Sequence, residues 1–332
     1  MIDPIGELLG AGDPALTWAV RHDILDERVD ARSLWTLPEV ERICRRQRRD
    51  GGWAYPGARV RAELRAAEDY AQLATYKQLL VLVSKYRLDR RHPAIGPAAE
   101  FLLGRQTGDG DIRGMYGNQY SPNYTADILG LLIEAGYGDD PRVRRGLDWL
   151  LEIRQRDGAW ALPLRTVGPK PGGFAAVMKL REPIEPDRAR PSSHLITGVV
   201  LRALAAHPAY RRRRETQDAA LVLVSRFFRP DRYADRRSAA YWTKLTFPFR
   251  WTDIVSSLDA VGRIGLTAED KHVREALTWL RDHQRKDGLW SSGYPVTKDP
   301  LVDHWVTFAA ARAWKRLRLL EPAHQRHVLA AV

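Results

Sequence analysis

The segment WLRDHQRKDGLW (residues 279–290) joins the end of a helix-like stretch to an Asp-Gly pair and a tryptophan three positions after the aspartate. The arrangement recurs in ERICRRQRRDGGW (41–53), in EFLLGRQTGDGDI (100–112, with isoleucine in place of tryptophan) and in WLLEIRQRDGAW (149–160), and a degraded copy is SRFFRPDRY (225–233). Glycine just after a helix can adopt the left-handed conformation that ends it. Each copy therefore predicts a helix end.

A glutamine precedes the aspartate by three positions in three of these copies, at Gln47, Gln106 and Gln284. In the copy at 149–160 the same place holds Arg154, and Gln155 follows it. Six threonines lie between the copies, each near the start of an apolar, helix-like stretch: Thr17, Thr75, Thr125, Thr197, Thr252 and Thr307. Their spacing covers two helices and their connections, so the sequence predicts six repeated helix pairs.

The Q-x-x-D-G-x-W pattern resembles the QW repeat of the squalene cyclase and protein prenyltransferase superfamily, over a span from about Trp18 to Trp314. The resemblance implies an all-α fold, an (α/α)6 toroid of about twelve helices, six inner and six outer, formed by residues 1–332 as one domain. It also implies that the QW residues are structural staples, with the tryptophan stacked over the glutamine. An open α-solenoid would use the same local signals.

The two repeated signals together predict where the helices lie. Inner helices are expected at 14–28, 67–84, 122–136, 193–207, 250–265 and 301–318, and outer helices at 37–49, 94–106, 142–155, 214–228, 270–284 and 321–331. Pro14, Pro122 and Pro191 precede or open three inner helices, where the missing backbone donor costs little.

Composition limits the class of protein. The chain has 332 residues, 44% of them hydrophobic, and its formal net charge is +12. Its apolar runs are short and interrupted by charges, and its first residues do not resemble a signal peptide, so we expect a cytoplasmic protein. The arginine-rich runs at 45–49 and 210–215 can contact an anionic membrane, although a solvated surface is the favoured interpretation. No nucleic-acid-binding motif is present, so no nucleic-acid partner is expected.

The catalytic residues of the resembling families are not in their usual places. Cyclases that begin by protonating an alkene resemble one another in an Asp-x-Asp-Asp-Thr-Ala motif, and the best match here, Thr125-Ala126, has Asn123 at the position of the acid. Asparagine cannot donate a proton as an acid, so we expect no activity with squalene. Protein prenyltransferases hold zinc with Asp, Cys and His. The single cysteine, Cys44, lies on a predicted outer helix, and Val306 occupies the place of the histidine, so no metal and no cofactor are expected.

Polar and aromatic residues nevertheless gather around the starts of the predicted inner helices, which share one end of a ring. Carboxylates in an apolar cavity can act as acids. The candidate catalytic residues are Asp127, Asp253, Asp303 and His304; the candidate substrate-binding residues are Tyr76, Tyr124, His194, Trp242, Trp251 and Trp305. We expect them to meet at the mouth of one central cavity. An aspartate near a helix start can equally well compensate the helix dipole.

Two connections border this expected mouth. Residues 161–192 form a long loop, either a lid or an extended crossover, and residues 241–253 are rich in aromatic rings that could face a polyene or cover the core. The sequence thus favours an enzyme that acts on an isoprenoid or similar apolar substrate with a non-standard acid. The alternatives are a non-catalytic toroid that binds a lipid or peptide and, less favoured, a carbohydrate-active enzyme with paired carboxylates among Asp109, Asp111, Asp139 and Asp140.

Overall fold

The computed structural model describes residues 1–55, 70–168, 173–294 and 299–319. The chain divides into two compact units, and each is described by itself: unit 1 comprises Met1–Val29 and Arg211–Val332, and unit 2 comprises Asp30–Tyr210. The predicted outer helix at 321–331, together with the first residues of the predicted inner helix at 67–84, lies outside the described residues.

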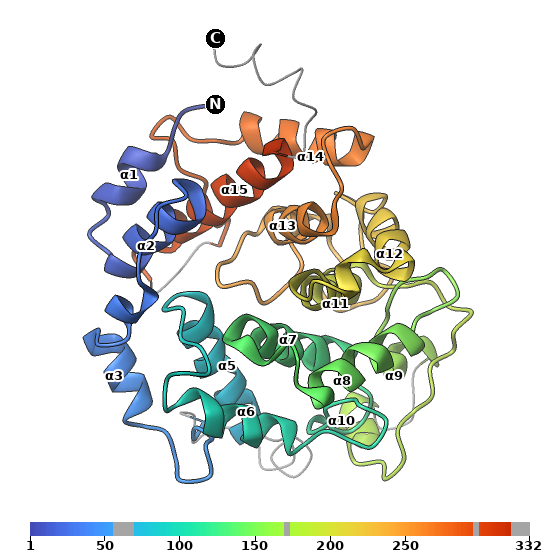
Figure 1. The fold of residues 1–332 in the computed structure, drawn as a ribbon. Helices are drawn as coiled ribbons and strands as arrows, with labels where there is room; N and C mark the ends of the chain where they lie inside the picture. The colour runs from blue at the N-terminus through green and yellow to red at the C-terminus, as the bar shows by residue number, and fades with distance from the viewer. Residues whose placement is uncertain (56–69, 169–172, 295–298, 320–332) are drawn as a thin grey trace. The chain divides into compact units, whose positions relative to one another are not determined.

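Unit 1 is built from helices at the two ends of the chain (Figure 1). They are α1 (Ile5–Gly10), α2 (Pro14–Ala19), which continues as the π-helical turn η1 (Val20–Ile24), α12 (Arg214–Val224), the 3-10 helix η5 (Ala239–Thr243), α13 (Ile254–Ile264), α14 (Lys271–Asp282) and α15 (Val302–Leu319). Helices α13 and α15 pack side by side, α12 and α14 pack on α13, and α1, α2 and η1 pack on α15.

Burial distinguishes the inner from the outer helices of unit 1. Every residue of α13 except Arg263 is buried, which is typical of a helix with neighbours on all sides. Helix α14 buries only Val273, Ala276, Leu277 and Leu280, a single stripe at helical spacing. Gly265, with φ of 116°, ends α13 in the left-handed conformation that favours glycine.

Unit 2 contains the middle of the chain. Its elements are the 3-10 helix η2 (Ala31–Leu34), α3 (Pro38–Cys44), α5 (Tyr70–Ser84), α6 (Ile95–Leu103), the short strand β1 (Met115–Asn118), α7 (Pro122–Leu132) with the π-helical turn η3 (Ile133–Tyr137), α8 (Pro141–Glu152), α9 (Pro163–Thr166), α10 (Gly173–Met178) and α11 (His194–Ala206); the 3-10 turn η4 (Tyr210–Arg212) follows at the boundary. Helix α7 packs against α5, α8 and α11, and α6 packs on α5 (Figure 1).

The predicted all-α class, typical of an α/α toroid, is confirmed for the described residues. Five of the six repeat threonines lie within helices, and Thr252 lies two residues before α13. The helices that contain or follow them begin at or within four residues of the predicted inner starts, except α5, whose predicted start is not described. The connection at 161–192, expected to be either a lid or an extended crossover, contains the short helices α9 and α10.

The Asp-Gly segments are joined to the repeat threonines by one repeated set of hydrogen bonds. The hydroxyl of Thr307 accepts from the backbone N–H of Trp290 at 2.8 Å, and the indole N–H of Trp290 donates to the carbonyl of Leu280 at 2.8 Å. The equivalent threonine contacts are Thr75 with Trp53, Thr125 with Ile112 and Thr197 with Trp160. Trp53, Trp160 and Trp290 are all buried, in agreement with a structural role for these residues.

The glutamines of the motif tie each segment to the start of another one. Gln106 donates through one amide nitrogen to the carbonyls of Gly110 and of Arg142, at the start of α8. The amide nitrogens of Gln47 and Gln284 likewise donate to two backbone carbonyls each. In the copy that displaces the glutamine by one position, Gln155 bonds the carbonyls of Asp187 and Arg190 instead, at 2.8 and 2.9 Å.

Candidate functional site

The clearest convergence of predicted site residues is in unit 2, around the carboxylate of Asp127 on α7. Tyr76, on α5, donates its hydroxyl hydrogen to one carboxylate oxygen at 3.0 Å. Arg202, on α11, forms an ion pair with the other oxygen at 3.1 Å. Three neighbouring helices thus present an acid, a phenol and a guanidinium to one another, and the ion pair stabilises the charged carboxylate.

A row of aromatic rings extends from this carboxylate. The rings of Tyr76 and Tyr124 meet edge to face with centroids 6.1 Å apart, and Tyr124 lies 5.2 Å from Tyr116 on β1. Tyr116 in turn meets Phe174 of α10 edge to face at 5.6 Å. We name Tyr76, Tyr124, Tyr116 and Phe174 the aromatic row. Tyr124, Tyr116 and Phe174 are half-buried, so part of each side chain remains outside the packed core.

The position where cyclases carry their acid contributes a neutral amide to the same region. Asn123 is buried in the first turn of α7, and its amide nitrogen donates to the hydroxyl oxygen of Tyr116 at 3.3 Å. His194 is the first residue of α11 and is 8% exposed, on a helix capped by the Ser193 hydroxyl. Of the residues predicted to line the cavity, unit 2 therefore holds Tyr76, Tyr124, Asp127 and His194.

Asp253, in unit 1, is fully buried and caps α13. One carboxylate oxygen accepts from the backbone N–H of Ser256 at 2.8 Å, while the Ser256 hydroxyl accepts from the backbone N–H of Asp253, which is a complete capping box. The second oxygen accepts from the backbone and the hydroxyl of Thr246 at 3.2 and 3.3 Å. These contacts give Asp253 a structural role at the start of α13.

Asp303 and His304 lie in the first turn of α15. Asp303 accepts from the guanidinium of Arg285 at 2.8 Å and from the backbone N–H of Ser292 at 2.9 Å, so it joins the helix to the Asp-Gly-Trp segment at 279–290 and the residues just after it. The Nδ1 atom of His304 is buried and has no hydrogen-bond partner among the described residues. The Nδ1 atom of His304 is thus not engaged by a hydrogen bond within the described chain, unlike the carboxylates of Asp253 and Asp303.

The three tryptophan candidates occupy different surroundings. Trp305 is buried, stacks on Phe247 with centroids 5.3 Å apart and meets Phe308 edge to face. Trp242 is 1% exposed and donates to the carbonyl of Arg229, which gives it a packing role. Trp251 is half-buried, with the guanidinium of Arg236 5.3 Å from its ring.

Sequence reasoning missed a buried ionic cluster beside these rings. Asp259 of α13 pairs with Arg312 and Arg316 of α15 and with Arg263, and Arg312 also reaches Asp23. Burial alone would raise the pKa of Asp259, but the charges of the three arginines hold that pKa well below its usual value. The spacing of Arg312 and Arg316 on one helix face was the available signal.

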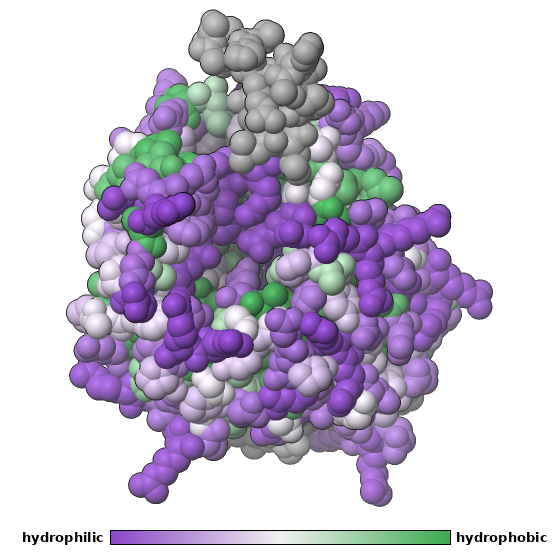
Figure 2. Space-filling model, in the orientation of Figure 1, coloured by the Kyte–Doolittle hydropathy of each residue, from purple (hydrophilic) through white to green (hydrophobic). Residues whose placement is uncertain are grey.

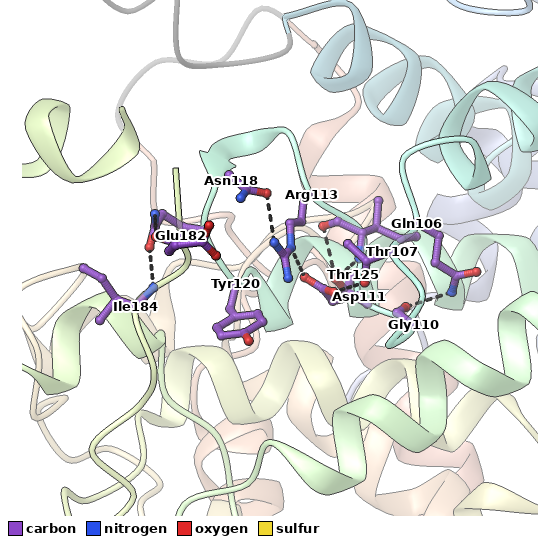
Figure 3. Close-up of polar contacts among 12 residues, drawn as sticks. Gln106, Thr107, Gly110, Asp111, Arg113, Asn118, Tyr120, Thr125, Glu182 and Ile184 are labelled. Carbon is purple, nitrogen blue, oxygen red and sulfur yellow. Dashed lines mark hydrogen bonds and ion pairs between the residues drawn. The ribbon is translucent and has the colours of Figure 1, made fainter. Parts of the chain in front are cut away.

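A second missed cluster lies in unit 2 after the Asp-Gly segment that lacks tryptophan (Figure 3). Asp111 is fully buried and accepts from the guanidinium of Arg113 at 2.8 Å and from the hydroxyl of Thr107. Arg113 also donates to Asn118 at 2.9 Å and lies over the ring of Tyr120. The arrangement clamps the turn that precedes β1.

The residues that follow β1 anchor the second half of the long connection. Gln119 donates to the carbonyl of Glu182 and accepts from the backbone N–H of Ile184 at 2.9 Å. Tyr120 donates to Glu185 at 2.8 Å, and burial together with this carboxylate raises the pKa of Tyr120 to about 12. Residues 182–185 are therefore fixed to the short segment between β1 and α7.

The remaining candidates give little support to other chemistries. Burial raises the pKa of the Cys44 thiol, which disfavours the reactive thiolate. Within residues 1–55, 70–168, 173–294 and 299–319, no three His, Cys, Asp or Glu side chains are grouped to hold a metal ion. No helix of the described chain combines the length and the apolar character needed to cross a bilayer. Hydrophilic side chains cover most of the face in Figure 2, with scattered hydrophobic ones.

Comparisons with known proteins find likeness in structure only. No family model matches the chain, and no curated protein matches its sequence. A protein from Actinoplanes is 16% identical, with 88% of this chain and 100% of that chain covered and a TM-score of 0.29. The type II terpene cyclase MstE from Scytonema, without ligand, is 15% identical, with 91% and 99% covered and a TM-score of 0.33. A variant of that enzyme bound to its product, merosterolic acid A, is 14% identical, with 92% of this chain and 99% of that chain covered and a TM-score of 0.35. At these TM-scores the likenesses carry no argument about the site.

Proposed function

We propose that the protein binds an isoprenoid or a similar apolar molecule along the aromatic row and acts on it as a terpenoid cyclase-like or prenyltransferase-like enzyme. The observation that carries this proposal is the hydrogen bond from the Tyr76 hydroxyl to the paired carboxylate of Asp127, because the Tyr76 ring continues into the half-buried rings of Tyr124, Tyr116 and Phe174. Aromatic faces and a carboxylate both stabilise a cation that forms on a hydrocarbon chain.

The four candidate acids have different roles in this proposal. Asp253 caps α13 and Asp303 is bonded to Arg285, so both are assigned to the framework. Asp127 forms an ion pair with Arg202, and we assign it to stabilising positive charge on the substrate rather than to donating a proton. His304 lies in unit 1, so the proposal assigns it no role at the aromatic row, which belongs to unit 2.

A non-catalytic binder of a lipid or peptide is the second candidate function. The Asp127–Arg202 ion pair favours it. The charge of the Asp127 carboxylate is already compensated by the guanidinium, so a catalytic role is not needed to explain the carboxylate. The carbohydrate-active alternative is weaker. Asp111, one of its candidate carboxylates, is fully buried and paired with Arg113, and so is not available as half of a catalytic pair.

Binding and turnover of isoprenoids test the proposal. Purified protein is incubated with squalene, geranylgeraniol and geranylgeranyl diphosphate; binding is followed by native mass spectrometry and products by gas chromatography. We expect one of the geranylgeranyl probes to bind, and Tyr124→Leu to weaken it about tenfold, as loss of a cation–π or stacking face would. Asp139→Asn is the matched control, because that carboxylate is exposed.

The outcomes separate the candidates. A product that disappears in Asp127→Asn supports the enzyme, whereas binding without any product supports the non-catalytic binder. Cyclised squalene would contradict the expectation drawn from Asn123, and binding of none of the three probes would reject the proposal.

A further inference from the structure

The second half of the connection between α9 and α11 is held to the rest of unit 2 by hydrogen bonds. In addition to its contacts with the segment after β1, the backbone N–H of Asp187 donates to the Thr166 hydroxyl at 2.8 Å. The backbone N–H of Arg156 donates to the carbonyl of Arg188 at 2.9 Å. Residues 182–190 are therefore a fixed part of the unit, and we name them the anchored half.

Helix α10, in the first half of the same connection, is held in a different way. In the part of the chain that the structure describes, no hydrogen bond or ion pair joins α10 to another element. Its contacts are made by side chains: Phe174 meets Tyr116 edge to face at 5.6 Å, and the guanidinium of Arg165 lies 5.3 Å from the centre of the Phe174 ring. Val177 and Met178 are buried. An element held by a few packed side chains opens more readily than one held by hydrogen bonds.

The two ends of α10 allow it to turn. Gly173, its first residue, has a φ of 66°, and a Cβ added there would meet no atom within 4 Å. Glycine adopts both signs of φ without steric cost, so this position can change conformation. At the other end, Lys179 and Leu180 are exposed. Rotation at these two ends would move Phe174 without breaking a hydrogen bond of the anchored half.

The neighbours of Phe174 in the aromatic row are held independently of α10. Tyr116 accepts from the side-chain amide of Asn123 at 3.3 Å, and its ring lies 5.2 Å from that of Tyr124. Neither contact involves α10. Phe174 is thus the end of the row and belongs to a loosely held element, while Tyr116 and Tyr124 are fixed by their own partners.

We propose that α10 is a lid on the aromatic row, with Phe174 as its gating residue. The proposal rests on the proposed function, because the row is where the isoprenoid ligand would bind. When α10 lifts, the contact between Phe174 and Tyr116 is broken and the end of the row is uncovered. When α10 closes on a bound hydrocarbon chain, Phe174 packs against that chain and excludes water from the row. The sequence of α10, GFAAVM, has no polar side chain, so the lid covers an apolar part of the ligand.

Distances between two spin labels on the full chain test the movement without any ligand. One label replaces Asp139, an exposed residue of unit 2, and the second replaces either Lys179, just after α10, or Arg188, in the anchored half; Cys44→Ser removes the native thiol. Double electron–electron resonance should give two distances for the label at Lys179 and one for the label at Arg188. The two distances at Lys179 are those of the closed and the lifted lid.

Loss of the Phe174 ring should shift this equilibrium. Phe174→Ala should raise the ratio of lifted to closed lid about fivefold, because it removes an aromatic pair and a cation–π contact. Phe101→Ala is the matched control, since Phe101 is also half-buried in unit 2 with a guanidinium, that of Arg105, 5.7 Å from its ring. Thermal melting shows whether each variant is folded. A single distance at Lys179 in both the wild type and Phe174→Ala would overturn the proposal.

A bound ligand should close the lid. With geranylgeraniol, the label at Lys179 should show the closed distance alone, and Phe174→Ala should release the ligand about tenfold faster than the wild type or Phe101→Ala in stopped-flow displacement. Geranylgeraniol that binds but changes neither the distances nor, in Phe174→Ala, the rate of release would overturn the lid and leave the proposed function intact. If no isoprenoid binds, the proposed function fails, and the distances measured without ligand alone decide whether α10 moves.

Discussion

Thr307 accepts a hydrogen bond from the backbone N–H of Trp290, 17 residues earlier in the chain, at 2.8 Å. Three other threonines make the same contact with the residue three positions after an Asp-Gly aspartate. The repeat threonine is therefore the partner of the Asp-Gly-Trp segment, and the two sequence signals are halves of one structural unit. Thr307 is fully buried, so the backbone group that it satisfies has no access to water.

Removing the Thr307 hydroxyl should destabilise the protein without changing side-chain volume. Thr307→Val leaves the Trp290 N–H buried and unsatisfied, which costs about 1–3 kcal/mol of unfolding free energy. Chemical denaturation measures the change. Thr267→Val is the control, since the Thr267 hydroxyl bonds Glu269 at an exposed turn, and an equal loss in both variants would contradict the explanation.

Replacing the staple tryptophan should cost more. Trp290 is 1% exposed, and Trp290→Ala should lower the unfolding free energy by about 3–5 kcal/mol because it leaves a large cavity. Ligand affinity per folded molecule should not change. A variant that melts like the wild type but no longer binds its ligand would reverse the assignment of Trp290 to the framework.

Gln155 rather than Arg154 should carry the staple in the third copy. Gln155→Leu leaves the carbonyls of Asp187 and Arg190 without their shared donor, and should cost about 1–3 kcal/mol in denaturation. Arg154→Ala is the paired variant and should cost less, since Arg154 only caps the carbonyl of Leu151. A larger loss of stability in Arg154→Ala than in Gln155→Leu would show that the position in the motif, and not the observed hydrogen bonds, determines which residue stabilises this segment.

The buried cluster around Asp259 should give the protein an acid-dependent stability. The folded-state pKa of Asp259 is lowered, so its contribution is fully present above the ordinary aspartate value of 3.8 and is lost as the pH falls below it. Asp259→Asn should cost about 3–5 kcal/mol at neutral pH, because it leaves arginines buried without their partner. Denaturation curves at several pH values should show the difference between variant and wild type shrinking in acid; a constant difference would contradict this account.

Tyr120 should ionise at a higher pH than an unperturbed tyrosine. Its pKa is raised to about 12, so stability from its protonated form persists below the ordinary value of 10.0 and is lost as the pH rises toward 12. Ultraviolet titration should show a late-ionising tyrosine that is absent in Tyr120→Phe. Glu185→Gln should move that step to lower pH, because the carboxylate that accepts the Tyr120 hydroxyl hydrogen is removed.

Several features of the chain could be predicted from its sequence because their causes are local. Asp-Gly fixes a tight turn just beyond a helix rather than the helix end itself: α14 ends at Asp282, and Gly288 adopts a φ of 83° in the turn that follows. Apolar periodicity then sets which helices are inner and which are outer, as the contrast between α13 and α14 shows. The all-α class, the helix starts and the burial of Trp53, Trp160 and Trp290 all follow from such short-range signals.

Tertiary structure decided the roles of the charged residues, because their partners are distant in the chain. Asp127 meets Arg202 at a separation of 75 residues, and Asp259 meets Arg312 at 53. The sequence does not distinguish Asp253 from a catalytic acid. In the structure its oxygens accept hydrogen bonds from Thr246 and Ser256, and Asp253 caps α13. Packing between helices decides whether a carboxylate forms an ion pair, caps a helix or is open to a ligand. The sequence repeat is the same for every helix pair, so it does not encode these differences.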